Sequence, residues 1–186
     1  MEALLHLERA HRAAEQVALA QAAADAEQEI ALRGQASCGL PTPEDIEGPY
    51  YKPGAPLKAN FVESDSKAEK LVVAGLVLSM SGCRPLSSIR LDFWHADDKG
   101  EYDARGFRYR GIVETDAQGR YRLETNLPPP YLGRPRHIHV KTQVRGGPVL
   151  TTQLYFPGEA RGADRALVVK PGPAGPVRTV LFDFLI

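Results

Sequence analysis

Residues 88–95 read Ser88-Ile89-Arg90-Leu91-Asp92-Phe93-Trp94-His95. Ile89, Leu91 and Phe93 alternate with Arg90 and Asp92, which predicts a strand with one face in a core and the other face polar. Runs that alternate or are wholly apolar recur along the chain, at 71–80, 107–114, 120–125, 137–144, 149–156 and 177–185. Seven short strands at this spacing predict a mainly β protein, built as an antiparallel β-sandwich.

Turn residues separate these runs. Asp97-Asp98-Lys99-Gly100 and Asp116-Ala117-Gln118-Gly119 have the composition of tight turns. Three further connections are rich in proline, at 41–56, 128–135 and 171–176. Because loops held by a rigid scaffold often carry binding and catalytic residues, we expect the functional site among these connections.

The first part of the chain has a different composition. Residues 3–33 contain Ala, Glu, Gln, Leu and Arg but no Pro or Gly, which predicts one long N-terminal α-helix ended by Gly34. Its apolar stripe is thin and consists mostly of alanine, so the helix should pack on the domain or on a second copy of the chain. We therefore divide the chain into a helix at 1–34, used for packing or dimerisation, and a β-sandwich catalytic domain at 35–186.

Bulk composition excludes several classes of partner. Lys+Arg and Asp+Glu both number 23, so no net field recruits nucleic acid or an anionic membrane. No apolar run approaches the roughly 20 residues that a membrane span needs. The first thirty residues are rich in acidic side chains and lack an apolar signal core, which favours a cytoplasmic protein. The alternative is a secreted or periplasmic protein whose signal segment has been removed.

The strongest chemical signal lies in the run from Tyr131 to His139. His137 and His139 alternate with apolar Ile138 in a predicted strand, so both imidazoles should lie on one face. Two neighbouring neutral nitrogen ligands are typical of a metal site. Tyr131 and Arg134 precede this pair, an arrangement that common zinc sites do not require.

The remaining ligands decide which metal such a site prefers. Carboxylates suit ferrous iron, whereas anionic, electron-donating phenolates favour ferric iron. Tyr131 is close to the histidine pair in sequence, and Tyr102 follows the polar turn that ends at Gly100. Two other interpretations stay open: a zinc hydrolase that uses His95, His137 and His139, and a non-enzymatic β-sandwich binding module.

Between residues 41 and 158 the chain resembles the intradiol ring-cleavage dioxygenases. The order and approximate spacing of the motifs agree throughout, and the short Tyr131-to-His137 gap is similar to that of the compact branch. The motifs are Thr42-Pro43-Glu44, Glu47-Gly48-Pro49-Tyr50-Tyr51, Trp94-His95-Ala96-Asp97, Gly100-Glu101-Tyr102-Asp103, Phe107-Arg108-Tyr109-Arg110-Gly111, Thr115-Asp116, Gly119-Arg120-Tyr121, the Tyr131-to-His139 run and 150–156.

The resemblance implies a non-haem Fe(III) enzyme. Such an enzyme uses O2 to open a catechol between its two hydroxyl-bearing carbons and gives a muconate-type diacid. The implied metal ligands are Tyr102, Tyr131, His137 and His139. Tyr131 would also leave the metal and take a substrate proton, so it is both a ligand and a catalytic residue.

The resemblance implies further roles around these ligands. Arg134 would stabilise negative charge on the substrate, Gln153 would help to hold the site by hydrogen bonding, and Pro49 and Tyr50 would line the slot for the ring. His95 would support the structure rather than bind metal. The family likeness does not select one substituted catechol.

The chain has two cysteines, Cys38 and Cys83. In the compact secreted members that the chain resembles, cysteines at these positions pair, which implies a disulfide here. The alternative is a pair of free thiols in a reducing cytoplasm.

Overall fold

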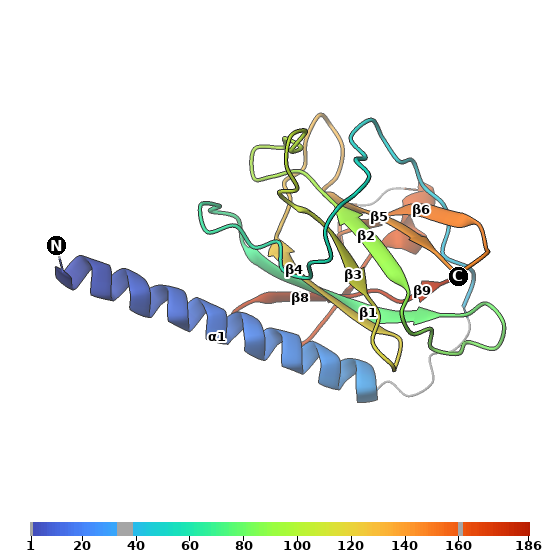
Figure 1. Cartoon of the computed structure of the whole chain (residues 1–186), viewed down its shortest axis with the longest axis horizontal. Helices are drawn as coiled ribbons and strands as arrows, with labels where there is room; N and C mark the ends of the chain where they lie inside the picture. The colour runs from blue at the N-terminus through green and yellow to red at the C-terminus, as the bar shows by residue number, and fades with distance from the viewer. Residues whose placement is uncertain (1, 33–38, 160–161) are drawn as a thin grey trace.

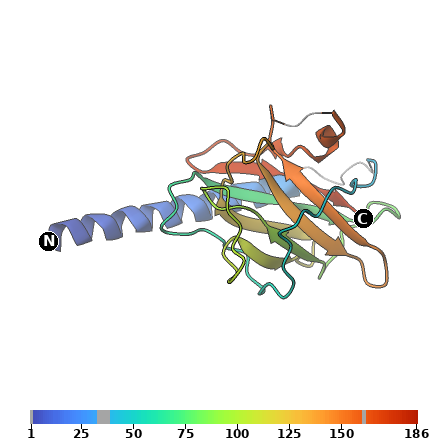
Figure 2. The same cartoon turned by 90° about the horizontal axis from the view of Figure 1, so that it is seen from above.

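The computed structural model describes residues 2–32, 39–159 and 162–186. Three layers follow one another: a long helix, a five-stranded sheet and a four-stranded sheet (Figure 1, Figure 2). The predicted mainly β sandwich with an N-terminal helix is confirmed. The elements are α1 (Glu2–Leu32), β1 (Lys70–Leu78), β2 (Arg90–Trp94), β3 (Arg110–Glu114), β4 (Arg120–Asn126), β5 (His137–Gln143), β6 (Val149–Tyr155), η1 (Gly162–Leu167), β7 (Lys170–Pro171), β8 (Arg178–Leu181) and β9 (Phe184–Leu185).

The strands of the four-stranded sheet run in the order β3-β2-β5-β6, with every neighbouring pair antiparallel. Its inner face packs against the other sheet through the apolar residues that the alternation singles out, including Leu91, Phe93, Ile138 and Val140. Leu71, Val73 and Leu123 supply part of the opposite side of this core. The alternate residues of β2 and β5 therefore lie on the outer face of the sheet, away from the core.

The five-stranded sheet departs from a wholly antiparallel arrangement. β1 pairs antiparallel with β4 but parallel with β8 and β9, because the chain crosses the whole sandwich before it returns to β1. The predicted strand at 177–185 is split into β8 and β9. At the break Asp183 Oδ1 accepts the amide hydrogen of Leu76 at 2.8 Å. An ideal Cβ on Gly75 would lie 1.7 Å from the carbonyl oxygen of Phe182, so only glycine fits beneath this break.

α1 packs with only one half of its length. Its buried residues all lie toward its C-terminal end and contact β1, β4 and β8; they are Leu19, Ala22, Ala23, Ala26 and Ile30. The N-terminal half carries exposed Leu4, Leu7 and Val17 and extends past the sandwich (Figure 1). No helix among the described residues is long and apolar enough to cross a membrane. The predicted end at Gly34 lies outside the described residues.

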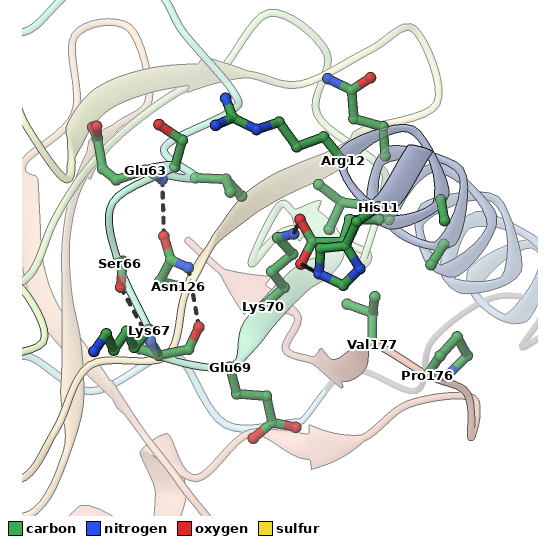
Figure 3. Close-up of a pocket in the computed structure, with 18 of the residues that line it drawn as sticks. His11, Arg12, Glu63, Ser66, Lys67, Glu69, Lys70, Asn126, Pro176 and Val177 are labelled. Atoms are coloured by element: carbon green, nitrogen blue, oxygen red, sulfur yellow. Dashed lines mark hydrogen bonds and ion pairs between the residues drawn. The ribbon is translucent and has the colours of Figure 1, made fainter. Parts of the chain in front are cut away.

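A groove of about 790 Å³ separates α1 from the segment at 60–70 (Figure 3). Charged side chains of both signs line it, and a 2.6 Å ion pair between Lys70 and Glu15 bridges its two walls. The groove contains none of the side chains predicted as metal ligands. The Lys70–Glu15 ion pair joins α1 to β1 at this place.

Cys83 is disulfide-bonded. Cys38 lies outside the described residues, so the Cys38–Cys83 pairing stays a prediction.

Candidate metal centre

β5 presents the histidine pair on the outer face of the four-stranded sheet. Because Ile138 and Val140 enter the core, His137 and His139 point to the opposite side, as the alternation predicts. Each histidine is nevertheless only 1% exposed. Burial lowers the pKa of His137 to about 4 and that of His139 to about 2, so both rings are neutral near pH 7 and their nitrogen lone pairs are available.

Two tight turns bring the tyrosines to these histidines. Tyr102 follows the turn at Asp97–Gly100, in which the Gly100 amide donates to the Asp97 carbonyl oxygen at 3.0 Å. Tyr131 begins a second turn, in which the Arg134 amide donates to the Tyr131 carbonyl oxygen at 2.8 Å. The two turns touch, because an ideal Cβ on Gly100, whose φ is +81°, would lie 2.9 Å from Tyr131 Cβ. Glycine at 100 thus permits both the turn and the close approach.

Four donor atoms converge between these turns and β5. Tyr102 Oη lies 3.0 Å from Tyr131 Oη, 3.1 Å from His139 Nε2 and 3.5 Å from His137 Nε2. Tyr131 Oη lies 3.4 Å from His137 Nε2. Ligand atoms bound to one ion at about 2 Å lie roughly 3 Å from one another, so the spacing fits a single metal ion.

The second ring nitrogen of His137 supports this donor set. His137 Nδ1 lies 2.8 Å from the Pro135 carbonyl oxygen, which accepts its proton and leaves Nε2 free to bind metal. Burial raises the pKa of Tyr102. A trivalent cation opposes that effect by stabilising the phenolate, and two phenolates with two imidazoles are hard, electron-rich donors suited to Fe(III). The residues present therefore fit ferric iron.

His139 is held in place by its neighbours on the two adjacent strands. Trp94 on β2 and Gln153 on β6 are its cross-strand partners. The indole of Trp94 stacks on the His139 ring with centroids 4.8 Å apart and an angle of 7°. His139 Nε2 thereby keeps its direction toward Tyr102, although Nδ1 is buried without a hydrogen-bond partner among the described residues.

Arg134 lies at the edge of the donor cluster. Its Nη1 is 3.3 Å from His137 Nε2, and its Nη2 donates to Gln153 Oε1 at 2.8 Å. Gln153 is fully buried, and its amide nitrogen donates to the Ile46 carbonyl oxygen at 2.7 Å. The Tyr155 hydroxyl donates to Asp45 Oδ2 at 2.9 Å and also lies 3.2 Å from Gln153 Oε1. Gln153 therefore orients Arg134 and does not face the donor atoms directly.

The segment at 45–58 crosses the outer face of the sheet and covers the cluster from one side. Tyr50 stacks on Tyr102 with ring centroids 4.5 Å apart and is 42% exposed. Pro49 is exposed in the same turn. Both predicted pocket residues thus lie at the rim of the donor cluster, where a flat ring could enter beside Tyr102.

His95 is not part of the cluster. Its Nδ1 lies 2.7 Å from the Ala96 carbonyl oxygen and its Nε2 lies 2.7 Å from Thr125 Oγ1, so both ring nitrogens are used inside the protein. Among the residues that the structure describes, no three His, Cys, Asp or Glu side chains are grouped to hold a metal. The three-histidine zinc interpretation therefore has no support in this geometry.

Comparisons with known proteins agree with this architecture. A family model described as "Dioxygenase" matches residues 46–171. The chlorocatechol 1,2-dioxygenase of Pseudomonas sp. (strain P51) is 30% identical to this chain, in an alignment that covers 84% of this chain and 74% of that protein. The chain belongs to the intradiol ring-cleavage dioxygenase family.

Solved structures extend this likeness. The dioxygenase domain of a dioxygenase and carbohydrate-binding protein fusion from Streptomyces sp. SirexAA-E is 48% identical, with a TM-score of 0.73 over 78% of this chain and 97% of that chain. Chlorocatechol 1,2-dioxygenase from Pseudomonas putida is 27% identical, with a TM-score of 0.69 over 100% of this chain and 87% of that chain. The second match includes the region of α1.

Three residues of this family member received no role from the sequence. They are Trp94, which stacks on His139; Tyr155, which bonds to Asp45 near Gln153; and Arg110, which lies near Tyr102. A usable signal existed for the first. Trp94 is two residues from polar Asp92, so the alternation places both side chains on the outer face of the sheet. A large aromatic side chain on that face is expected to pack against another ring.

The buried histidines give the protein an acid-sensitive fold. Burial lowers the pKa of His95 to about 4, against about 6.5 in an unfolded chain. Between these values the unfolded chain binds a proton that the folded protein does not, so stability falls as pH falls. For His95 alone, the loss between pH 7 and pH 5 is about 2 kcal/mol of unfolding free energy.

Urea unfolding of iron-free protein at pH 7 and pH 5 measures this loss. The variant His95→Gln keeps a polar group near Thr125 but cannot titrate, so we expect it to lose about 2 kcal/mol less than the unmodified protein over the same interval. Equal losses in the two proteins would contradict the assignment of His95 as a neutral buried residue.

Proposed function

We propose that the protein is a non-haem Fe(III) dioxygenase that opens catechols between their two hydroxyl-bearing carbons with O2 and forms muconate-type diacids. The observation that carries this proposal is the convergence of Tyr102 Oη with Tyr131 Oη, His137 Nε2 and His139 Nε2 within 3.5 Å. Membership of the intradiol family supplies the reaction class.

In this proposal the four side chains hold the iron, which when bound acts as a Lewis acid and template for the catecholate and O2. Tyr131 has a second role. It lies on an exposed tight turn, with Leu132 and Gly133 both at positive φ, and its oxygen would accept one catechol proton. Tyr102 stays in place under the Tyr50 ring.

Arg134 supplies a fixed positive charge beside the substrate position. Its hydrogen bond to Gln153 orients the guanidinium before substrate arrives, so no reorganisation is needed when negative charge develops on the ring. Pro49 and Tyr50 bound the entrance for the ring.

Oxygen uptake with a panel of catechols tests the function. The panel contains catechol, a chlorocatechol, protocatechuate, hydroxyquinol and a catechol with a bulky substituent, and the products are identified by mass. We expect one O2 consumed per ring and a diacid product containing both oxygen atoms. Because the Tyr131–His137 connection is short, we also propose an open entrance. The bulky substrate should then react faster than catechol, and an equal or slower reaction would contradict the open entrance. Absence of uptake by iron-loaded protein with every substrate would contradict the proposed reaction.

We further propose that residues 1–34 serve packing and dimerisation, while residues 35–186 form the catalytic domain. The exposed apolar residues of the N-terminal half of α1, which include Leu4, Leu7 and Val17, would pair with a second copy. Light scattering decides this: twice the chain mass is expected, falling to a single chain when Leu4 and Leu7 are both changed to glutamate. A single chain mass for the unmodified protein would exclude the homodimer.

A further inference from the structure

Arg110 is a buried cation next to the donor cluster. It begins β3, and its side chain is only 3% exposed although it carries a charge. Its guanidinium carbon lies 5.8 Å from the centre of the Tyr102 ring. Its Nε donates to the main-chain carbonyl oxygen of Asp103 at 3.0 Å, which fixes the residue directly after Tyr102.

Asp103 and Asp92 attract this charge only from beyond ion-pair distance. Among the described residues, no Asp or Glu forms an ion pair with Arg110. The carboxylate of Asp103 is occupied by three backbone amides of its own loop, those of Arg105, Gly106 and Arg108. Arg110 Nη1 is buried without a hydrogen-bond partner among the described residues.

An unpaired buried cation destabilises a protein, because the ion loses its hydration without gaining an opposite charge. A guanidinium does not lose its proton under ordinary conditions, so the charge persists. The aromatic ring that the guanidinium faces is that of Tyr102, whose hydroxyl oxygen is one of the four converging donor atoms. The Arg110 charge therefore acts on the Tyr102 side chain at close range.

We propose that Arg110 is a positioning residue for Tyr102: it fixes the Tyr102 loop through the Asp103 carbonyl and sets the electron donation of the phenolate by its charge. This inference rests on the proposed role of Tyr102 as an iron ligand. A nearby positive charge stabilises the filled orbitals of a phenolate and weakens its donation. Removal of the charge should therefore lower the energy of the phenolate-to-iron charge-transfer band.

Three variants of the iron-loaded full chain separate charge from packing. Arg110→Gln is neutral but can still donate to the Asp103 carbonyl, and Arg110→Lys keeps the charge. The control is Arg108→Met, since Arg108 lies two residues away and forms an ion pair with Asp65 at 2.7 Å, without facing the Tyr102 ring. Each variant is measured by visible absorption, iron content, kcat and KM.

We expect Arg110→Gln to retain iron, with a band moved to longer wavelength by roughly 10–30 nm, as removal of one charge near the donor implies. Its kcat should fall severalfold while KM changes little. In Arg110→Lys the band should lie close to its wavelength in the unmodified protein, and in Arg108→Met its wavelength should be unchanged. This pattern would distinguish an effect of the Arg110 charge on Tyr102 from a purely structural role of Arg110.

An unshifted band in an iron-replete, folded Arg110→Gln protein would overturn the inference. An equal shift in Arg110→Gln and Arg110→Lys would do the same, because the charge would then have no effect. If instead the unmodified iron-loaded protein shows no charge-transfer band, the proposed iron ligation itself fails, which is a different outcome.

Discussion

Tyr102→Phe is expected to abolish retention of iron and, with it, ring cleavage. Tyr102 Oη lies within 3.5 Å of all three other donor atoms, so it is the central atom of the cluster. Loss of this oxygen would remove one of the anionic ligands of the iron. Removing even an outer hydrogen bond to a metal ligand typically costs about 10–100-fold in affinity, and removal of a direct anionic ligand should exceed that range. We expect less than about a tenth of the normal iron after dialysis, with turnover reduced by about a thousandfold.

Tyr121→Phe is the matched control. Tyr121 is a buried tyrosine of β4 whose hydroxyl donates to the Phe182 carbonyl oxygen at 2.8 Å, remote from the donor cluster. Loss of that hydrogen bond should cost about 1 kcal/mol of stability and leave iron content unchanged. Iron content by elemental analysis and oxygen uptake measure both variants. Full iron retention in Tyr102→Phe would remove Tyr102 from the ligand set.

Arg134→Met is expected to slow turnover strongly while the iron is retained. Arg134 touches His137 Nε2 at 3.3 Å but is a cation and supplies no lone pair to a metal. Its role is to stabilise charge that develops on the substrate, and loss of one such group usually costs about 10²–10³ in kcat. Arg134→Lys should recover only part of the rate, because lysine cannot reproduce the fixed bond to Gln153.

Arg136→Met is the control for this prediction. Arg136 lies two residues along the chain, but its Nε bonds to Glu159 Oε1 at 2.5 Å outside the cluster. Steady-state kinetics with the best substrate of the panel should show nearly normal kcat for this variant. Equal losses of kcat in Arg134→Met and Arg136→Met would indicate a general effect on the loop and not a catalytic role for Arg134.

The fold and the position of the histidine pair were predictable because both follow from period-two alternation. The inward set Leu91, Phe93, Ile138 and Val140 forms the core, and His137 and His139 lie opposite. The convergence of Tyr102 and Tyr131 needed more than periodicity. Tyr102 and Tyr131 are 29 residues apart and their loops meet at Gly100. Local pattern therefore offered the two tyrosines only as candidates, and the resemblance to the family implied that they act together.

Features that depend on tertiary packing could not be predicted from the sequence. The parallel pairing of β1 with β8 and β9 cannot be read from the composition of either strand, because it depends on the path of the chain around the sandwich. The break near Asp183 arises from one side-chain bond to the Leu76 amide. The sequence around Arg110 does not distinguish it from an exposed arginine at the start of a strand. Only the fold shows that Arg110 is buried beside Tyr102.

The visible absorption spectrum of metal-free protein titrated with iron in air tests the central claim most directly. If the phenol oxygens of Tyr102 and Tyr131 and the imidazoles of His137 and His139 bind one Fe(III), a broad charge-transfer band should grow until one iron per chain is bound. Tyr131→Phe should retain iron but show an altered band. A protein that stays colourless at one bound iron per chain, or a band unchanged in both the Tyr102→Phe and the Tyr131→Phe variants, would contradict the account.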